Sequence, residues 1–429
     1  ESTLSLVDVD NDGDLDVVGI GADENGASTS FILVNAISAG TGMTRQNLSV
    51  GLKNGDIAPA DVDNDGDVDL FLTGDDGTNP QAVLYLNNGS GQFTASTSSF
   101  TGLLGGEAEW ADLDNDGDVD LVYHGNGGTE ASTLVYLNQL SDGTFNPLAT
   151  GFPNVESGSL SLEDIDNDGW VDVLLTGSSG TELLSTVAIN NGDLTFTQDT
   201  GELPGVRDAS LASGDIDNDG DMDFFISGNE SLGGTTLLTE LYLNNGNGDF
   251  QKSTVDFPDV SNGRILIMDI DLDGKRDVLL QGVGTANLLE LWNNETLGNS
   301  ISFEKNEVSS ARFPALGGGS GIAISDLNGN STPDFLLTGI SDQPGAGPEW
   351  YFLSNEGADG NNTTPAAPEG LASSIAGSSV QLSWKDDGDG STYNLYVGTV
   401  SGQEQIKSAA SNITNGTRRL VENGNVGHS

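Results

Sequence analysis

Residues 8–16 read Asp-Val-Asp-Asn-Asp-Gly-Asp-Leu-Asp and place five aspartates within nine residues. Carboxylates this close repel one another, so the stretch needs a compensating partner. Six further copies follow, beginning at Asp61, Asp112, Asp164, Asp215, Asp269 and Asp326. Successive copies begin 53, 51, 52, 51, 54 and 57 residues apart. A unit that repeats at this period predicts a solenoid, an open array or a propeller.

Each repeat has the same internal order. An alternation of apolar and small residues, such as LSL at 160–162, precedes the acidic loop, and a short apolar stretch follows the loop and ends at a glycine. A polar loop then leads to a third stretch that closes at an asparagine, such as VLYLN at 83–87, and a Gly/Asn turn leads to a fourth. The period-2 patterning and the turn residues indicate strands. Four strands in a repeat of this length predict a propeller blade.

We therefore expect an all-β fold in which residues 1–356 form a seven-bladed β-propeller. An open array of the same units is the alternative. The seventh repeat has no fourth strand before the Pro- and Gly-rich linker at 357–367. We expect residues that precede Glu1 to supply that strand, and the chain to be a fragment or a processed form.

The acidic loop has the spacing of a calcium site. In D-x-D-x-D-G-x-x-D, side-chain oxygens at positions 1, 3, 5 and 9 and the carbonyl of position 7 can surround Ca²⁺, and glycine at position 6 permits the sharp turn. Position 7 accepts Trp170 and Lys275, so we expect its backbone to be the ligand. An EF-hand would need Glu at position 12, where the first two loops have Gly19 and Leu72. A merely solvated acidic loop is the remaining alternative.

The sequence predicts about six calcium sites, with the sixth weaker than the first five because Lys275 and Arg276 lie in it. The seventh should be weak or vacant, because two asparagines replace carboxylates and Ser331 replaces the glycine. The predicted ligand positions of the seven loops are Asp8, Asp10, Asp12, Asp14 and Asp16; Asp61, Asp63, Asp65, Asp67 and Asp69; Asp112, Asp114, Asp116, Asp118 and Asp120; Asp164, Asp166, Asp168, Trp170 and Asp172; Asp215, Asp217, Asp219, Asp221 and Asp223; Asp269, Asp271, Asp273, Lys275 and Asp277; and Asp326, Asn328, Asn330, Thr332 and Asp334.

Composition excludes several classes of function. The 429 residues carry 66 acidic and 13 basic side chains, a formal net charge of -53, so neither nucleic acid nor an anionic membrane surface is an expected partner. Cysteine is absent and histidine occurs twice, which leaves little material for zinc sites or imidazole catalysis. No apolar run is long enough for a transmembrane helix, so we expect no direct membrane insertion.

The seven acidic loops, each followed by an apolar strand and a glycine, resemble the FG-GAP/VCBS repeat family, whose propellers include the integrin α-subunit head. The resemblance covers residues 1 to about 356. It implies a calcium loop between the first and second strands of each blade. It also implies a secreted or cell-surface protein with an adhesive or carbohydrate-recognising role. Some propellers of this family belong to polysaccharide lyases.

Residues 368–429 resemble the beginning of a fibronectin type III domain. Trp384 matches the core tryptophan of that fold, and Tyr393 and Tyr396 match the following strand. We expect a partial β-sandwich that is cut off at Ser429. The DDGDG stretch at 386–390 fits a hairpin turn or a further calcium loop.

A few other side chains are candidates for chemistry. His124 lies next to a strand-ending glycine, where a structural role is expected, and Trp110, Trp292 and Trp350 are expected in the core. Trp170 is expected to point outward, where it would pack locally or stack on a sugar. Carboxylates for acid–base catalysis would come from the loops opposite the acidic ones: Glu130, Glu182, Glu230 and Glu349.

We expect a secreted or cell-surface calcium-binding propeller that recognises an extracellular glycan or protein. The alternative is the non-catalytic propeller of a larger polysaccharide-degrading enzyme, a lyase or a hydrolase. Catalysis by the propeller itself stays open, although no catalytic residue is assigned.

Overall fold

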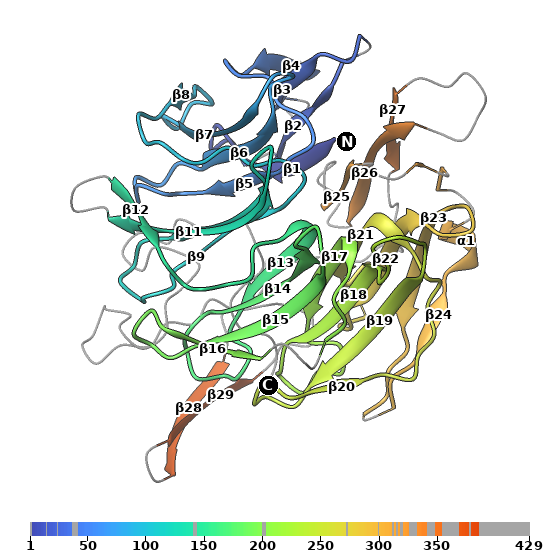
Figure 1. The fold of residues 1–429 in the computed structure, drawn as a ribbon. Coiled ribbons are helices and arrows are strands. Elements are labelled where there is room, and N and C mark those ends of the chain that lie inside the picture. The colour runs from blue at the N-terminus through green and yellow to red at the C-terminus, as the bar shows by residue number, and fades with distance from the viewer. Residues whose placement is uncertain are drawn as a thin grey trace.

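The computed structural model is almost entirely β-structure. It describes residues 2–13, 15–23, 25–36, 42–139, 144–199, 203–271, 273–298, 300–310, 313–314, 316–317, 321–325, 333–340, 348–353, 369–376 and 379–385. Its sheets are antiparallel meanders in which sequential strands pair with one another. They follow one another around the molecule from β1 to β27 (Figure 1).

The first three blades are four-stranded and contain β1 (Thr3–Val7), β2 (Asp16–Ala22), β3 (Ser28–Ala36) and β4 (Gly42–Asn47); β5 (Ile57–Ala60), β6 (Asp69–Asp75), β7 (Pro80–Leu86) and β8 (Thr94–Ala95); and β9 (Ala108–Ala111), β10 (Asp120–Asn126), β11 (Ala131–Gln139) and β12 (Thr144–Leu148).

The next three contain β13 (Glu156–Glu163), β14 (Asp172–Ser178), β15 (Leu183–Asn190) and β16 (Phe196–Asp199); β17 (Arg207–Gly214), β18 (Asp223–Asn229), β19 (Leu237–Asn244) and β20 (Phe250–Lys252); and β21 (Ser261–Met268), β22 (Asp277–Val283), β23 (Asn287–Asn294) and β24 (Phe303–Lys305).

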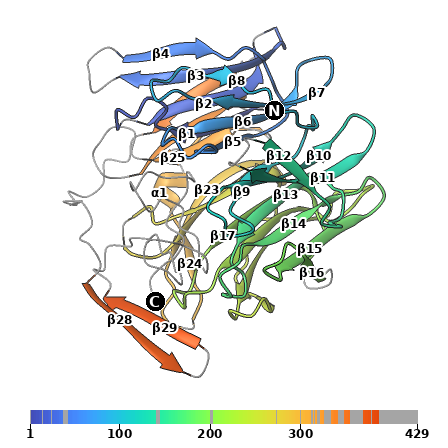
Figure 2. The ribbon, with the colours of Figure 1, turned by 90° about the vertical axis from the view of Figure 1, so that its left-hand side faces the viewer.

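The seventh sheet has three strands among the described residues, β25 (Gly321–Ser325), β26 (Asp334–Ile340) and β27 (Pro348–Leu353), and the ring closes where β25 contacts β1. Figures 1 and 2 both place these two strands side by side. The predicted seven-bladed propeller is therefore confirmed, and the open array is not. Among the described residues the one helix is α1 (Glu307–Ser310), and none is long and apolar enough to cross a membrane.

The hairpin of β28 (Glu369–Ala376) and β29 (Ser379–Lys385) forms a two-stranded sheet of its own (Figure 2). It lies at the start of the predicted fibronectin-like module. The linker, Tyr393, Tyr396 and the DDGDG stretch lie outside the described residues. The proposed domain boundaries and the β-sandwich stay predictions.

Apolar side chains fill each space between successive sheets. The second strand of a blade is buried on both faces because a neighbouring blade covers each face. Val18 of β2 packs with Leu70 and Leu72 of the next blade, whereas Val17 packs with Ala323 and Leu336 of the seventh sheet. The outermost strands β4, β8, β16 and β20 are largely exposed. This gradient explains why the second strand of every repeat is the most apolar.

In the first six acidic loops, a buried aspartate at position 9 anchors the loop to its blade. In the second blade, Asp69 is 1% exposed; its Oδ2 accepts a hydrogen bond from Val62 N at 3.1 Å and its Oδ1 accepts one from Asn87 N at 2.8 Å. The carboxylate therefore joins the start of the loop to the end of the third strand. The same pair of bonds recurs at Asp16, Asp120, Asp172, Asp223 and Asp277.

In the second to sixth blades, the asparagine that closes the third strand extends this anchor to the preceding blade. Asn87 Nδ2 donates to Val68 O of its own loop at 3.0 Å and to Val9 O of the first loop at 2.8 Å. Equivalent bonds between blades join Asn138 to Val62 O, Asn190 to Leu113 O, Asn244 to Ile165 O and Asn294 to Ile216 O. The VLYLN-type ending found in the sequence is thus a contact between blades.

Asn190→Ala should lower the free energy of unfolding by about 2–3 kcal/mol, because the buried carbonyls of Leu113 and Val171 lose their donor. Urea unfolding in saturating calcium measures the loss. Asn191→Ala is the matched control, since Asn191 is exposed and its side-chain hydrogen bonds, to Thr195 and from Thr197, stay within its own blade. Equal losses for the two variants would contradict the role of Asn190 as a contact between blades.

Candidate metal centres

Six of the acidic loops can be compared atom by atom; Asp14 and Leu272 are outside the described residues, as are residues 326–332 of the seventh loop. In the first five loops, one carboxylate oxygen from each of positions 1, 3 and 9 lies within 4.8 Å of the other two, and one further group of this kind is present. These groups are Asp8, Asp10 and Asp16; Asp61, Asp63 and Asp69; Asp112, Asp114 and Asp120; Asp164, Asp166 and Asp172; and Asp215, Asp217 and Asp223. Positions far apart in the loop are thus brought together at one point.

Position 1 fixes the turn of the loop. Asp61 Oδ1 accepts a hydrogen bond from Asp65 N at 3.1 Å, and its Oδ2 accepts one from Gly66 N at 3.0 Å. Asn64 and Gly66 have φ of 57° and 97°, the left-handed region that asparagine and glycine tolerate best. The D-x-D-N-D-G pattern is therefore a requirement of the backbone as well as a set of predicted ligands.

In the first, third and fifth loops, position 3 offers an oxygen that has no protein partner, whereas Asp63 Oδ1 and Asp166 Oδ1 accept hydrogen bonds from Asp65 N at 3.3 Å and Asp168 N at 3.2 Å. Asp10 Oδ1, Asp114 Oδ1 and Asp217 Oδ1 are each buried and accept no hydrogen bond. An unpartnered carboxylate oxygen away from water is costly unless a cation compensates it. Three convergent carboxylates with such an oxygen fit a hard divalent cation, which prefers oxygen ligands.

Positions 5 and 7 of each loop have a different role from positions 1, 3 and 9, whose carboxylates converge. Asp65 Oδ1 accepts a hydrogen bond from Asp67 N at 2.9 Å, and Asp116, Asp168, Asp219 and Asp273 repeat this bond with position 7 of their own loops. These bonds hold the segment whose carbonyl is the predicted ligand. Coordination by position 5 and by that carbonyl stays a prediction.

Burial and mutual repulsion raise the pKa of several of these carboxylates. Burial, with a smaller contribution from neighbouring carboxylates of the same loops, raises the pKa of Asp69 to about 8 and that of Asp120 to about 9. Burial likewise raises the pKa of Asp114 to about 6 and that of Asp215 to about 7. Protons and cations therefore compete for the same oxygens.

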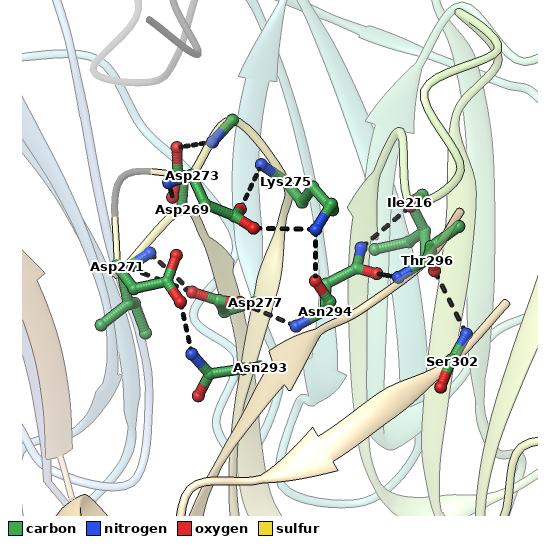
Figure 3. A network of polar contacts seen from close by, with 12 residues as sticks. Ile216, Asp269, Asp271, Asp273, Lys275, Asp277, Asn293, Asn294, Thr296 and Ser302 are labelled. Carbon is green, nitrogen blue, oxygen red and sulfur yellow. Dashed lines mark hydrogen bonds and ion pairs between the residues drawn. The ribbon is translucent and has the colours of Figure 1, made fainter. Parts of the chain in front are cut away.

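The sixth loop contains a positively charged side chain of its own, that of Lys275 (Figure 3). Lys275 Nζ donates to Asp273 Oδ2 at 2.8 Å and to Asn294 O at 3.3 Å. Asp271 Oδ2 accepts a hydrogen bond from Asn293 Nδ2 at 2.5 Å. The sixth loop thus differs from the first five in having an ammonium group on its position 5 carboxylate and a side-chain amide on its position 3 carboxylate. This arrangement is the physical basis for expecting weaker metal binding at the sixth site.

The other candidate side chains are mostly structural. His124 is fully buried, its Nε2 accepts from Glu107 N at 3.3 Å, and burial lowers its pKa to about 4, so it is neutral. Trp110 is 5% exposed and donates to Ala58 O at 3.0 Å, and Trp292 packs on Phe257. The ring of Trp170 lies over Gly192, where an added Cβ would approach it to 2.7 Å. Local packing therefore accounts for this half-buried ring.

The proposed acid–base carboxylates are not brought together in the described part of the chain. Glu130, Glu182 and Glu230 are exposed on separate loops, and the side chain of Glu349, like that of Trp350, is outside the described residues. These loops offer no matched pair for catalysis.

Sequence reasoning missed a charged cluster at the centre of the ring. Arg264 of β21 reaches across to the second blade, where its Nη2 lies 3.9 Å from Asp56 Oδ1. Glu107 Oε2 accepts from Ser159 Oγ at 2.5 Å and from Leu160 N at 3.1 Å. Each of the three charged residues stands five positions before the first aspartate of its loop, and this shared register was the available signal.

The cluster is sensitive to pH. Burial raises the pKa of Glu107 to about 7, and raises that of Asp56 as well, while the charge of Arg264 opposes both shifts. Asp56 Oδ2 also accepts a hydrogen bond from Ala108 N at 3.0 Å. The first strand of each of these blades begins near the cluster and ends at the acidic loop. The cluster therefore lies at the opposite end of the ring from the metal centres.

Glu107→Gln should flatten part of the dependence of stability on pH. Folded Glu107 keeps a proton that the unfolded chain releases from pH 4.5 upward, so the stability that this proton confers is full below pH 4.5 and is lost as pH rises through 7. The variant should gain up to about 3 kcal/mol relative to wild type between pH 4.5 and 8. Urea unfolding in saturating calcium tests this. The exposed Glu130→Gln is the control, and parallel curves for wild type and Glu107→Gln would disprove the assignment.

Comparison with known families supports the repeat assignment. Residues 61–123 and 164–226 match the model of the FG-GAP-like repeat. Each match begins at position 1 of one acidic loop and ends in the second strand of the following blade, so each covers two successive loops. A comparison with curated proteins finds no match. The chain is a seven-bladed β-propeller that carries FG-GAP-like repeats.

Proposed function

We propose that this protein is a secreted or cell-surface recognition module whose propeller is held in shape by calcium. The observation that carries the proposal is the repeated group of three convergent carboxylates, in three of which the position 3 oxygen is buried without a partner, as at Asp114. Such a group is stable when a cation supplies the missing interaction. The FG-GAP-like repeats support a recognition or adhesion role for the fold.

Calcium suits these sites better than other common cations. All side-chain donors are carboxylate oxygens, which disfavours zinc and copper, and the chain has no cysteine. Flexible loops that add a backbone carbonyl suit the large coordination number of Ca²⁺, whereas Mg²⁺ demands a tight octahedron and keeps its waters. The net charge of -53 also favours uptake of several divalent ions.

The recognition surface should lie on the face opposite the metal centres. The second strand of each blade runs from the acidic loop to the second-to-third-strand loops, which we call the distal loops: residues 76–79, 127–130, 179–182, 230–236 and 284–286. Loops carried by a rigid scaffold commonly provide binding surfaces.

At least one distal loop is already ordered for binding. Asp76 Oδ1 accepts hydrogen bonds from Thr78 N at 2.7 Å and from Asn79 N at 2.9 Å, and these bonds lower the pKa of Asp76. A loop that is fixed in advance loses little entropy when it binds a ligand. Extracellular glycans or proteins are the ligands we propose. The alternative is that the propeller positions the catalytic domain of a larger polysaccharide-degrading enzyme without acting on the substrate itself.

Removal of calcium should destabilise the protein strongly. Addition of EGTA should lower the melting temperature by about 10 °C or more, because each site with calcium at a hundredfold excess over Kd contributes about 2.7 kcal/mol. Asp114→Asn should remove about one such contribution, whereas Asp249→Asn, an exposed aspartate in a turn, should not. Differential scanning fluorimetry with Ca²⁺, Mg²⁺ or EGTA measures these shifts. A melting temperature indifferent to EGTA would reject the calcium proposal.

Glycan recognition should appear as retardation in native gels cast with acidic or neutral polysaccharides, and EGTA should abolish it because the scaffold loosens. Glu130→Gln combined with Glu182→Gln should reduce the retardation, since both side chains lie on distal loops. Asp249→Asn, which removes one exposed carboxylate outside the distal loops, is the control for each of the two single variants. Cleared zones after staining for polymer would instead indicate catalysis. Free migration in every gel would exclude the tested glycans.

A further inference from the structure

Neighbouring acidic loops are joined directly by the asparagine at position 4. Asn11 Nδ2 donates to Asp67 Oδ1 of the second loop at 2.8 Å, and Asn167 Nδ2 donates to Asp221 Oδ1 of the fifth loop at 2.8 Å. Asn64 Nδ2 donates to Gly117 O and to Asp118 Oδ1 of the third loop, each at 3.2 Å. Asn115 Nδ2 donates to Gly169 O of the fourth loop at 3.2 Å. Loops one to five therefore form a continuous chain of contacts.

Each contact reaches the part of the next loop that matters for metal binding. Position 4 lies between the carboxylates of positions 3 and 5, and its acceptors lie at positions 6 and 7 of the following loop. Position 7 also carries the predicted carbonyl ligand. The sequence indicated a backbone role alone for position 7; the structure adds a side-chain role at Asp67, Asp118 and Asp221. Where Trp170 replaces this aspartate, Asn115 uses the carbonyl of Gly169 instead.

The chain of contacts ends at the sixth loop. Position 7 is Lys275 there, and its ammonium group bonds within its own blade, to Asp273 and Asn294. Within the described residues, no hydrogen bond joins the Asn218 side chain to the sixth loop. Asn218 has the same residue type, loop position and left-handed backbone as Asn64, with φ of 58° against 57°. The fifth and sixth loops, which lack this link between them, therefore serve as an internal control for the linked loops.

We infer that the cation sites of loops one to five are positively coupled through the position 4 asparagines, whereas the sixth site fills independently. The inference rests on the proposed binding of calcium. A cation in one loop fixes positions 6 and 7 of that loop and so fixes the acceptor of the preceding asparagine. The preceding loop then has less freedom to lose when it binds its own cation. Repulsion between ions opposes this effect, so the sign of the coupling is a direct test.

The test is a double-mutant cycle that is read separately in each loop. Hydrogen exchange followed by mass spectrometry across a calcium titration gives a half-saturation concentration for each loop, in the full chain. Asp114→Asn disables the third site, and the second site is then observed. In an otherwise wild-type chain, we expect its half-saturation concentration to rise about three- to tenfold. In the Asn64→Gly background the rise should be less than twofold, because glycine keeps the left-handed backbone and removes only the side-chain link.

The matched arm uses the loops that are not linked. Asp271→Asn disables the sixth site, and the half-saturation concentration of the fifth should change less than twofold, with or without Asn218→Gly. A further variant, Lys275→Asp, gives Asn218 an acceptor like Asp118. In that background, Asp271→Asn should weaken the fifth site about threefold, which tests the coupling even if Asp114→Asn does not fold.

The outcomes separate the two proposals. Absence of calcium-dependent protection in every loop would overturn the proposed calcium binding itself. Calcium-dependent protection with a second site that ignores Asp114→Asn would overturn the coupling alone. A second site that responds equally with and without Asn64→Gly would also overturn it, as would a second site that binds calcium more tightly after Asp114→Asn.

Discussion

The fully buried aspartate at position 9 is the constraint around which each blade is organised. In the second blade, Asp69 receives one backbone hydrogen bond from the beginning of its loop and another from the end of the third strand. Asn87 extends this anchor to the first blade. The carboxylate belongs both to the hydrogen-bonded frame and to the convergent acidic group. Hence the same atoms determine the spacing of the blades and the geometry of the candidate metal centre.

The position 9 aspartate has both a structural and a predicted metal-binding role, and this has an energetic consequence. A carboxylate buried with two others of like charge is strained unless a proton or a cation is present, and burial raises the pKa of Asp69 to about 8. Protonation relieves the repulsion but supplies no ligand for the buried oxygens of position 3. A divalent cation does both. In the proposed calcium-bound state, the binding free energy of the cation would therefore also be folding free energy.

The two ends of the ring have different chemical characters. One carries the acidic loops, each linked to its neighbour up to the fifth, and is built as a repeated scaffold. The other carries the distal loops, which differ in length and composition between blades, and the cluster of Asp56, Glu107 and Arg264. Variation on one face above a uniform support on the other is an arrangement suited to recognition. The fold by itself does not determine the ligand.

The sequence alone determined the repeat, the number of blades and the loop register. These follow from local requirements: a left-handed turn needs asparagine and glycine, as at Asn64 and Gly66, and an apolar second strand must be buried on both faces. Tertiary structure alone decided that Asn87 and Asn64 bond to neighbouring blades, and that Arg264 approaches Asp56 from the opposite side of the ring. Such contacts join residues separated by one or more whole repeats, and they depend on how the blades close around the axis, which no local pattern records.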